Sequence, residues 1–319
     1  MDAFLPMLKN VLLFVALAIP GFLLVKCKLL SQEQSGALSK LLMYVGMPFL
    51  ILSGTVGNLT FNGDTLLTVG LTAVIGVAYT FAMFFASGPL AATEKDTKAK
   101  GMLRFCAVFS NNGFLGIPLA VAVFGKDDPM FAVLIVLNII TNVLMFTLGA
   151  YLVSGDKRSI NLKKAFLNPV LIAFLIGIPL NLLDIKTHAP DVVTYIGHFS
   201  NLVTPISMTI LGMKLGAVKI TALFTSWRTY YTAALKLILF PVVIVAALMA
   251  FHVIPGSIIG KDMVLGFFVA FAVPTAGLAS TFADSFNGDT KGAVAFTLGT
   301  TLLSILTIPL LYLLLCLCL

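Results

Sequence analysis

The amino-acid sequence predicts an all-α integral membrane protein, because of its composition and the length of its apolar runs. Of the 319 residues, 59% are hydrophobic and 10% are charged, whereas soluble domains contain about 45–50% apolar and about 25% charged residues. Apolar runs long enough for a helix to cross a hydrocarbon core of ~30 Å recur along the whole chain. These runs are too long for the strands of an outer-membrane barrel, which take about 10 residues.

The apolar runs predict ten membrane-spanning helices joined by short loops. The predicted spans are residues 4–25, 39–56, 66–90, 101–124, 130–153, 166–183, 192–213, 229–251, 263–286 and 291–317. Because this leaves no sizeable domain outside the membrane, the function must be carried out within the bilayer.

The positions of lysine and arginine predict how the spans are oriented. Fifteen of the 20 basic residues, Lys214 among them, lie in or beside the loops that follow the odd-numbered spans, and four lie on the opposite side. Positive residues collect on the cytoplasmic side of a membrane. We therefore expect a protein of the cell membrane with both termini outside the cytoplasm. Lys236 is the one basic residue well inside a predicted span.

The chain divides into two halves of five spans each. Residues 1–153 and residues 166–319 flank a basic, polar linker of residues 154–165, which we expect to be cytoplasmic. Because five is an odd number, the two halves have opposite orientations in the membrane. This arrangement is an inverted repeat, which is common in secondary transporters.

Helix-breaking residues lie near the midpoints of the fourth and ninth spans. Span 4 contains Gly116 and Pro118, and span 9 contains Pro274 and Gly277. Proline removes a backbone donor and glycine relaxes the chain, so we expect two broken helices that cross near the bilayer midplane. The freed backbone groups need partners, because hydrocarbon offers none. Free N–H groups at the start of a half-helix favour an anion.

The candidate substrate-binding residues surround these breaks. They are Asn111, Asn112, Gly113, Thr275 and Ala276. An amide at the midplane needs a hydrogen-bond partner, which substrate or the broken backbone could supply. The Thr275 hydroxyl could donate to an anion or bond back to its own helix.

Three further polar residues lie inside predicted spans. Asn138 and Asn142 are four residues apart and share one face of span 5. They either line a transport path or form hydrogen bonds between helices. Lys236 either attracts anions into an inner vestibule or extends to the membrane interface.

Several motifs resemble those of the auxin efflux carrier family, which includes bacterial permeases and plant PIN proteins. Residues 111–119 resemble its fourth-span signature, and residues 272–276 resemble its ninth-span proline motif. The pair Asn168-Pro169, and Pro205 with Gly212, are similar to its sixth and seventh spans. The resemblance covers essentially the whole chain.

The resemblance implies an NhaA-like fold of ten helices. Spans 1, 2, 6 and 7 would form a scaffold that often dimerises, and spans 3–5 and 8–10 would form a moving transport domain. Transport would follow elevator-like alternating access, with malate- or malonate-like carboxylates as substrates of bacterial members and indole-3-acetate as that of plant members. The short loop after span 5 is similar to the bacterial type, and the uncharged span 3 departs from plant members.

Uniport or exchange is expected because no aspartate or glutamate lies deep in a span, whereas proton- and sodium-coupled carriers commonly use buried carboxylates. The alternatives are a sodium-coupled organic-anion carrier of the bile-acid-transporter type, an auxin-like carrier of aromatic carboxylates, and a channel. The sequence contains no motif of a membrane enzyme and no nucleotide-binding loop. No nucleic-acid partner, cofactor or metal is predicted, and the four cysteines lack the spacing of metal ligands.

Overall fold

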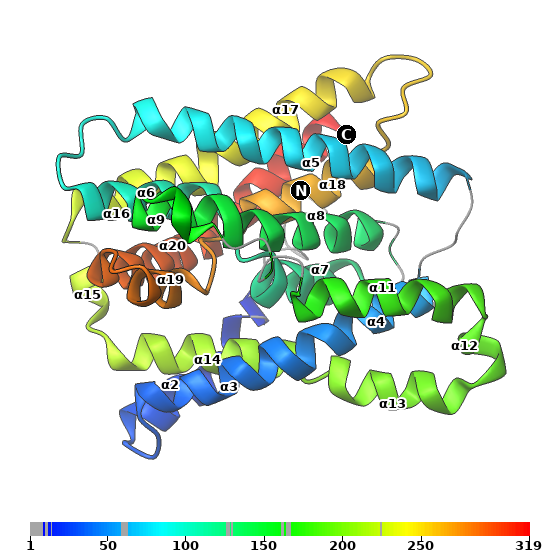
Figure 1. The fold of residues 1–319 in the computed structure, drawn as a ribbon, viewed down its shortest axis with the longest axis horizontal. Helices are drawn as coiled ribbons and strands as arrows, with labels where there is room; N and C mark the ends of the chain where they lie inside the picture. Colours follow the sequence, from blue (N-terminus) through cyan, green and yellow to red (C-terminus); the bar gives the residue numbers. More distant parts are fainter. Residues whose placement is uncertain are drawn as a thin grey trace.

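The computed structural model describes residues 9, 12–13, 15–58, 63–125, 128, 130–160, 163, 167–223 and 225–319. In these ranges the regular elements are helices, and the one β-type pairing is an isolated antiparallel bridge between Ser110 and Thr275. Figure 1 shows most of the helices running along the long axis of the molecule. The predicted all-α class is confirmed.

Five helical stretches in the described ranges are long and apolar enough to cross a membrane. They are Gln32–Gly57, Leu66–Leu90, Met130–Ser154, Trp227–His252 and Thr290–Cys318. They coincide with predicted spans 2, 3, 5, 8 and 10, and they support a multi-pass membrane protein.

The helices follow one another with few long connections. In chain order they are α2 (Ile19–Lys26), α3 (Ser35–Leu41), α4 (Met47–Asn58), α5 (Gly63–Leu90), α6 (Thr97–Val108), α7 (Ile117–Phe124), α8 (Met130–Leu144), α9 (Ala150–Ser154), α11 (Pro169–Leu182), α12 (Ile185–His188), α13 (Pro190–Ser200), α14 (Val203–Ala217), α15 (Ile220–Leu223), α16 (Trp227–Ala233), α17 (Phe240–His252), α18 (Lys261–Ala272), α19 (Ala279–Ser285) and α20 (Thr290–Cys318).

The other predicted spans are short, interrupted or only partly described. Span 4 is interrupted between α6 and residue 112, and span 9 is interrupted between α18 and α19. Span 7 is divided at Asn201 and Leu202, between α13 and α14, and Pro205 lies in the first turn of α14. Helix α14 continues past the predicted end of span 7, so Lys214 lies inside a helix and not in a loop. Residues 4–8, 10–11 and 14 of span 1, and residues 161–162 and 164–166 around the linker, lie outside the described residues.

Within the described ranges, four π-helical turns interrupt the α-helices. They are η2 (Leu42–Gly46), η3 (Asn112–Gly116), η4 (Met145–Gly149) and η6 (Ala234–Leu239). Such turns are rare and are found frequently at functional sites. The turn η3 contains three of the candidate residues, and η6 contains Lys236.

The helices pack into two groups. In the first group α2 packs against α14, and α4 packs against α11 and α13. In the second group α8 packs against α5 and α18, α17 packs against α18, and α16 packs against α20. Figure 1 shows the first group along one side of the molecule and α5, α8, α17 and α18 along the other.

Two glycines set the close approach of α2 to α14. A Cβ atom on Gly212 would lie 1.9 Å from the carbonyl oxygen of Ala18, and one on Gly21 would lie 2.0 Å from that of Thr209. Small residues let helix backbones approach closely where hydrocarbon supplies no hydrophobic driving force. This contact fixes the position of α14 and therefore of Lys214.

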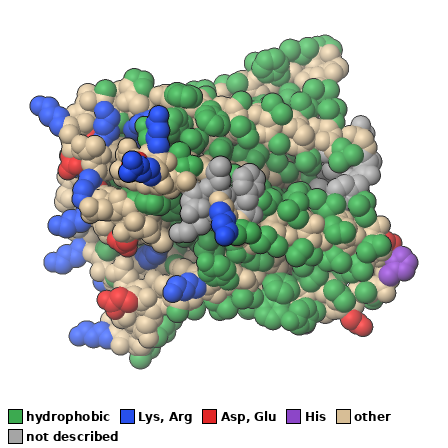
Figure 2. Space-filling model, viewed as in Figure 1, with side chains coloured by type: hydrophobic (Ala, Val, Ile, Leu, Met, Phe, Trp, Pro, Cys, Tyr) green, Lys and Arg blue, Asp and Glu red, His purple; other side chains and the backbone are tan. Residues whose placement is uncertain are grey.

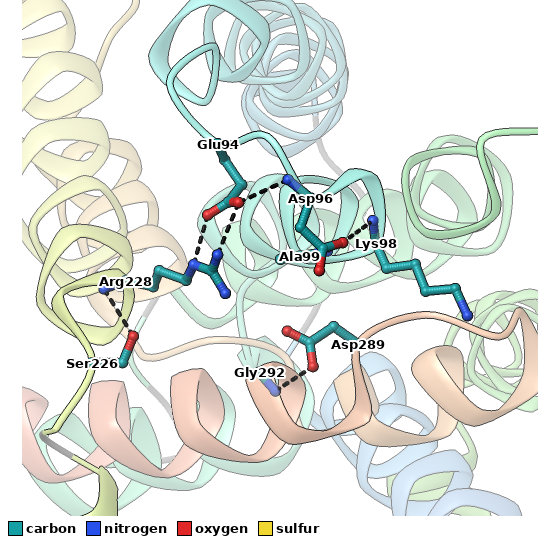
Figure 3. Close-up of polar contacts among 8 residues, drawn as sticks. All are labelled: Glu94, Asp96, Lys98, Ala99, Ser226, Arg228, Asp289 and Gly292. Carbon is teal, nitrogen blue, oxygen red and sulfur yellow. Dashed lines mark hydrogen bonds and ion pairs between the residues drawn. The ribbon is translucent and has the colours of Figure 1, made fainter.

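Basic side chains gather at one end of the molecule, on the left of the view in Figure 2. At that end Arg228 of α16 forms a two-point ion pair with Glu94 in the connection between α5 and α6, with Nε–Oε2 at 2.6 Å and Nη2–Oε1 at 2.9 Å (Figure 3). The paired planes of guanidinium and carboxylate make this a geometrically specific contact. Asp96 caps the start of α6 and Asp289 caps the start of α20 in the same region.

Candidate functional site

The two interrupted helices cross as a short antiparallel pairing of extended backbone. The Asn111 N–H donates to the Pro274 carbonyl oxygen at 2.8 Å, and the Ala276 N–H donates to the Phe109 carbonyl oxygen at 2.9 Å. The bridge between Ser110 and Thr275 lies between these two bonds. Each interruption therefore satisfies backbone groups that the other leaves free, as a dry membrane interior requires.

Thr275 also stabilises the crossing. Its hydroxyl donates to the Cys106 carbonyl oxygen at 2.8 Å, near the C-terminal end of α6, and its N–H donates to the hydroxyl of Thr300 at 3.3 Å. The Thr275 side chain is fully buried. Its hydroxyl thus bonds neither to its own helix nor towards a cavity, but to the opposite broken helix.

Lys236 also contacts this crossing. Its ammonium donates to the Ser110 hydroxyl and, at 3.3 Å, to the Phe271 carbonyl oxygen. The side chain is 0% exposed, so the ammonium is enclosed by protein in this structure. A cation at the C-terminal end of α18 interacts favourably with the helix dipole.

A cavity of about 40 Å³ adjoins the crossing, and four amides and three methionines are among its lining residues. We call it the amide cavity, after its lining residues Asn111, Asn138, Asn142 and Asn168. Gly113, Ala276 and Gly277 also line it. At ~10–15 Å³ for each water by this measure, the cavity has room for about three water molecules.

The amides of this cavity are only partly satisfied by the protein. Asn142 Nδ2 donates to the Asn138 carbonyl oxygen at 2.8 Å, within one helix and not between helices. Asn168 Oδ1 accepts from the Val170 N–H and caps α11, whereas Asn168 Nδ2 is buried without a hydrogen-bond partner among the described residues. A buried donor that lacks a partner carries a cost of about 1–3 kcal/mol, which a bound acceptor would remove.

The remaining predicted residues lie beside the amide cavity and do not line it. Asn112 is buried, and its Nδ2 donates to the Thr141 hydroxyl at 3.0 Å. Gly116 lies in η3 and Pro118 in the first turn of α7, after the interruption rather than within it. A Cβ atom on Gly116 would lie no closer than 3.7 Å to its neighbours, so no close backbone approach requires glycine there.

The lining of the amide cavity is uncharged, and it combines amides and hydroxyls with apolar side chains. Among the described residues that line it there is no aspartate, glutamate, lysine or arginine. A search of the described part of the chain also gives no group of three or more histidine, cysteine, aspartate or glutamate residues that could hold a metal ion. Hydrogen bonds from amides and backbone are the chemistry that this cavity offers a ligand.

Sequence reasoning missed three polar residues near the crossing. The sequence analysis uses Asn168 only as part of the family resemblance, although an asparagine before a proline is a typical helix cap. Thr141 lies one helical turn from Asn138, and this spacing could have indicated it. Lys214 reaches the Gly277 carbonyl oxygen, at 3.3 Å, and nothing in its local sequence indicates this contact.

Comparison with known proteins gives a family and two relatives. The family described as membrane transport protein matches residues 6–161 and 156–312 of the chain. An uncharacterized transporter of Methanothermobacter thermautotrophicus is 28% identical over 212 residues, which cover 65% of this chain and 67% of the relative. An uncharacterized transporter of Methanocaldococcus jannaschii is 26% identical over 211 residues, which cover 64% of this chain and 68% of the relative. The matches point to a transporter rather than an enzyme.

Proposed function

Because the chain belongs to the auxin efflux carrier family of membrane transport proteins, we propose that it is a secondary transporter of small organic anions. The substrates are malate- or malonate-like carboxylates. The observation that carries the proposal is the amide cavity at the crossing of two broken helices, which offers hydrogen-bond donors and no negative charge. Carboxylate oxygens accept hydrogen bonds from such donors.

Asn111 and Asn168 are the residues that we assign to direct substrate contact in this cavity. Asn168 Nδ2 has no hydrogen-bond partner among the described residues, and Asn111 lines the cavity next to Gly277. Asn138 and Asn142 also line the cavity. Thr275 and Asn112 hold the crossing in shape, because their side chains already bond to Cys106 and Thr141.

The packing of the helices supports elevator-type alternating access. The group of α2, α4, α11, α13 and α14 corresponds to spans 1, 2, 6 and 7, and it would form the scaffold and the interface of a homodimer. The other group would carry the amide cavity across the membrane. This assignment requires ten spans in two inverted repeats, of which residues 1–153 and 166–319 are the halves.

The charge distribution supports an orientation in the cell membrane. Basic side chains gather at one end of the molecule (Figure 2), and this end faces the cytoplasm under the positive-inside rule. Both termini then lie outside the cytoplasm.

Counterflow tests the function. Purified protein is reconstituted into liposomes loaded with unlabelled malate, and the accumulation of external labelled malate is measured with and without sodium. Wild-type protein accumulates the label without sodium, as uniport or exchange requires. Asn111→Ala loses about tenfold in apparent affinity, the equivalent of one charged hydrogen bond. The control Gln32→Ala removes an exposed amide and leaves counterflow unchanged.

Three results would contradict parts of this proposal. Folded wild-type protein that accumulates no carboxylate would exclude the organic-anion function. Accumulation that requires sodium would favour the sodium-coupled alternative. Accumulation that Asn111→Ala leaves unchanged would retain the function and remove Asn111 from the site.

A further inference from the structure

A second cavity adjoins the amide cavity on the same crossing. Its volume is about 60 Å³, and Asn111, Phe114, Gly277 and Leu278 line both cavities. The rest of its lining differs in chemistry. It combines five apolar residues with one lysine and several hydroxyls, which are Lys214, Ser39, Ser207, Thr281, Thr297 and Thr301. We call it the lysine cavity.

The Lys214 ammonium is only partly satisfied by the protein. It has three N–H donors, and the structure gives it one hydrogen bond, at 3.3 Å, to the Gly277 carbonyl oxygen. The one ion pair among the described residues joins Arg228 to Glu94, so no carboxylate of the described chain neutralises Lys214. A partly buried cation without a counter-ion is unfavourable unless an anion approaches it.

A buried hydroxyl in the same cavity gives a second, independent indication of a ligand. Thr297 is 6% exposed, and its Oγ1 has no hydrogen-bond partner among the described residues. Thr301 and Ser207, by contrast, donate to carbonyl oxygens of their own helices. Thr281 lines the cavity and is exposed, which gives the cavity a route to the surface near α19.

We infer that the lysine cavity binds a carboxylate of the substrate, with Lys214 as its counter-ion and the Thr297 hydroxyl as a second donor. The inference rests on the proposed function and adds the charged contact that the amide cavity lacks. A dicarboxylate has one group for each cavity, because the two cavities meet at Asn111 and Gly277. A substrate with a single carboxylate loses one of these contacts.

The two donors come from different groups of helices. Lys214 lies on α14, which packs against α2, whereas Thr297 lies on α20, which packs against α16. A carboxylate bound between them bridges the scaffold and the moving group in the described conformation. The Lys214 ammonium therefore contacts the substrate at one stage of the transport cycle, and it stays with the scaffold when the two groups of helices move apart.

Ligand-induced stabilisation tests the inference without transport. The thermal unfolding midpoint of purified protein in detergent is measured against malate, malonate and the uncharged analogue malonamide, since a ligand that binds the folded state raises the midpoint. Wild-type protein is stabilised by both acids and not by malonamide. Lys214→Met weakens the apparent affinity for malate roughly 10- to 100-fold, which corresponds to a charged hydrogen bond. Lys214→Arg retains the affinity, and the exposed control Lys219→Met leaves it unchanged.

A second variant keeps the test decisive if Lys214→Met does not fold. Thr297→Val keeps the shape of the side chain, leaves Lys214 in place and removes only the unpartnered hydroxyl. This variant should therefore fold and bind malate more weakly than wild-type protein. Equal malate affinity in wild-type, Lys214→Met and Thr297→Val proteins would overturn the inference and leave the transport function standing. Stabilisation by malonamide as strong as by malonate would also overturn it. If neither acid stabilises wild-type protein, the inference is wrong. Counterflow measured with the same preparation then decides separately whether the proposed transport function is also wrong.

Discussion

Lys236 and Lys214 each bring an ammonium to the crossing of the broken helices, but their surroundings differ. Lys236 is fully buried and donates to a hydroxyl and to the carbonyl oxygen of Phe271, near the end of α18. Lys214 has one long hydrogen bond to the Gly277 carbonyl oxygen and lines a cavity together with an unpartnered hydroxyl. Lys236 is therefore part of the structure of the crossing, whereas the Lys214 ammonium keeps N–H donors that a ligand can use.

The difference shows what decides the role of a charge inside a membrane protein. Sequence analysis singles out intramembrane charge as functional, and it selects Lys236 on that ground. In the structure, the hydrogen-bond partners of the ammonium and the free volume beside it decide its role more than the position of the residue along its membrane span. An ammonium enclosed by backbone and hydroxyl oxygens has no access for a ligand, whereas one beside a cavity does.

Charge reversal at the two lysines should give the largest effects and separate their roles. Lys236→Glu places a buried carboxylate beside the Phe271 carbonyl oxygen and at the negative end of a helix dipole, and an uncompensated buried charge costs about 3–5 kcal/mol. We expect almost no folded protein by size-exclusion chromatography. Lys214→Glu should fold, because its cavity admits water, and should lose malate-induced stabilisation. Folded Lys236→Glu protein would contradict the structural role of Lys236.

A matched pair of threonine variants gives an intermediate effect. Thr275→Val removes the donor to the Cys106 carbonyl oxygen, and a buried acceptor left without a partner costs about 1–3 kcal/mol. Thr297→Val removes a hydroxyl that has no partner among the described residues, so it should unfold at the same temperature as wild-type protein or above it. Thermal unfolding of both proteins without ligand measures the difference. Equal destabilisation of the two variants would show that Thr297 has a structural partner in solution.

Two glycine variants should give the smallest effects, and they test the amide cavity. A Cβ atom on Gly113 would lie 2.8 Å from Met47 Cε and 3.0 Å from Asn138 Nδ2, whereas one on Gly277 would lie 3.4 Å from its nearest neighbours. Overpacking costs about 1–3 kcal/mol, and a single added methyl group lies at the lower end of this range. We expect Gly113→Ala to displace the Asn138 amide and slow malate counterflow, and Gly277→Ala to slow it less, because its Cβ atom fits without displacing a neighbour. The opposite order of the two rates would show that the free space at Gly277, where the two cavities meet, matters more than the position of the Asn138 amide.

The sequence predicted the membrane class and the interrupted fourth and ninth spans from composition and from helix-breaking residues. It also selected Asn111, Asn138 and Asn142, which the structure brings together around one cavity. It assigned Lys214 to a loop, because the apolar run ends at residue 213 while α14 continues to Ala217. The extent of an apolar run indicates which part of a helix lies in hydrocarbon and cannot indicate how far the helix extends beyond it.

The sequence by itself determined that this protein lies in a membrane and that two of its helices break there, since hydropathy and proline act on their own segments. Only the tertiary structure decided which polar groups are satisfied. The Thr275 hydroxyl bonds to Cys106, 169 residues away, and Lys214 reaches Gly277, 63 residues away. Such contacts depend on how the helices pack, and packing leaves Lys214 and Thr297 with hydrogen-bonding capacity that the protein itself does not use.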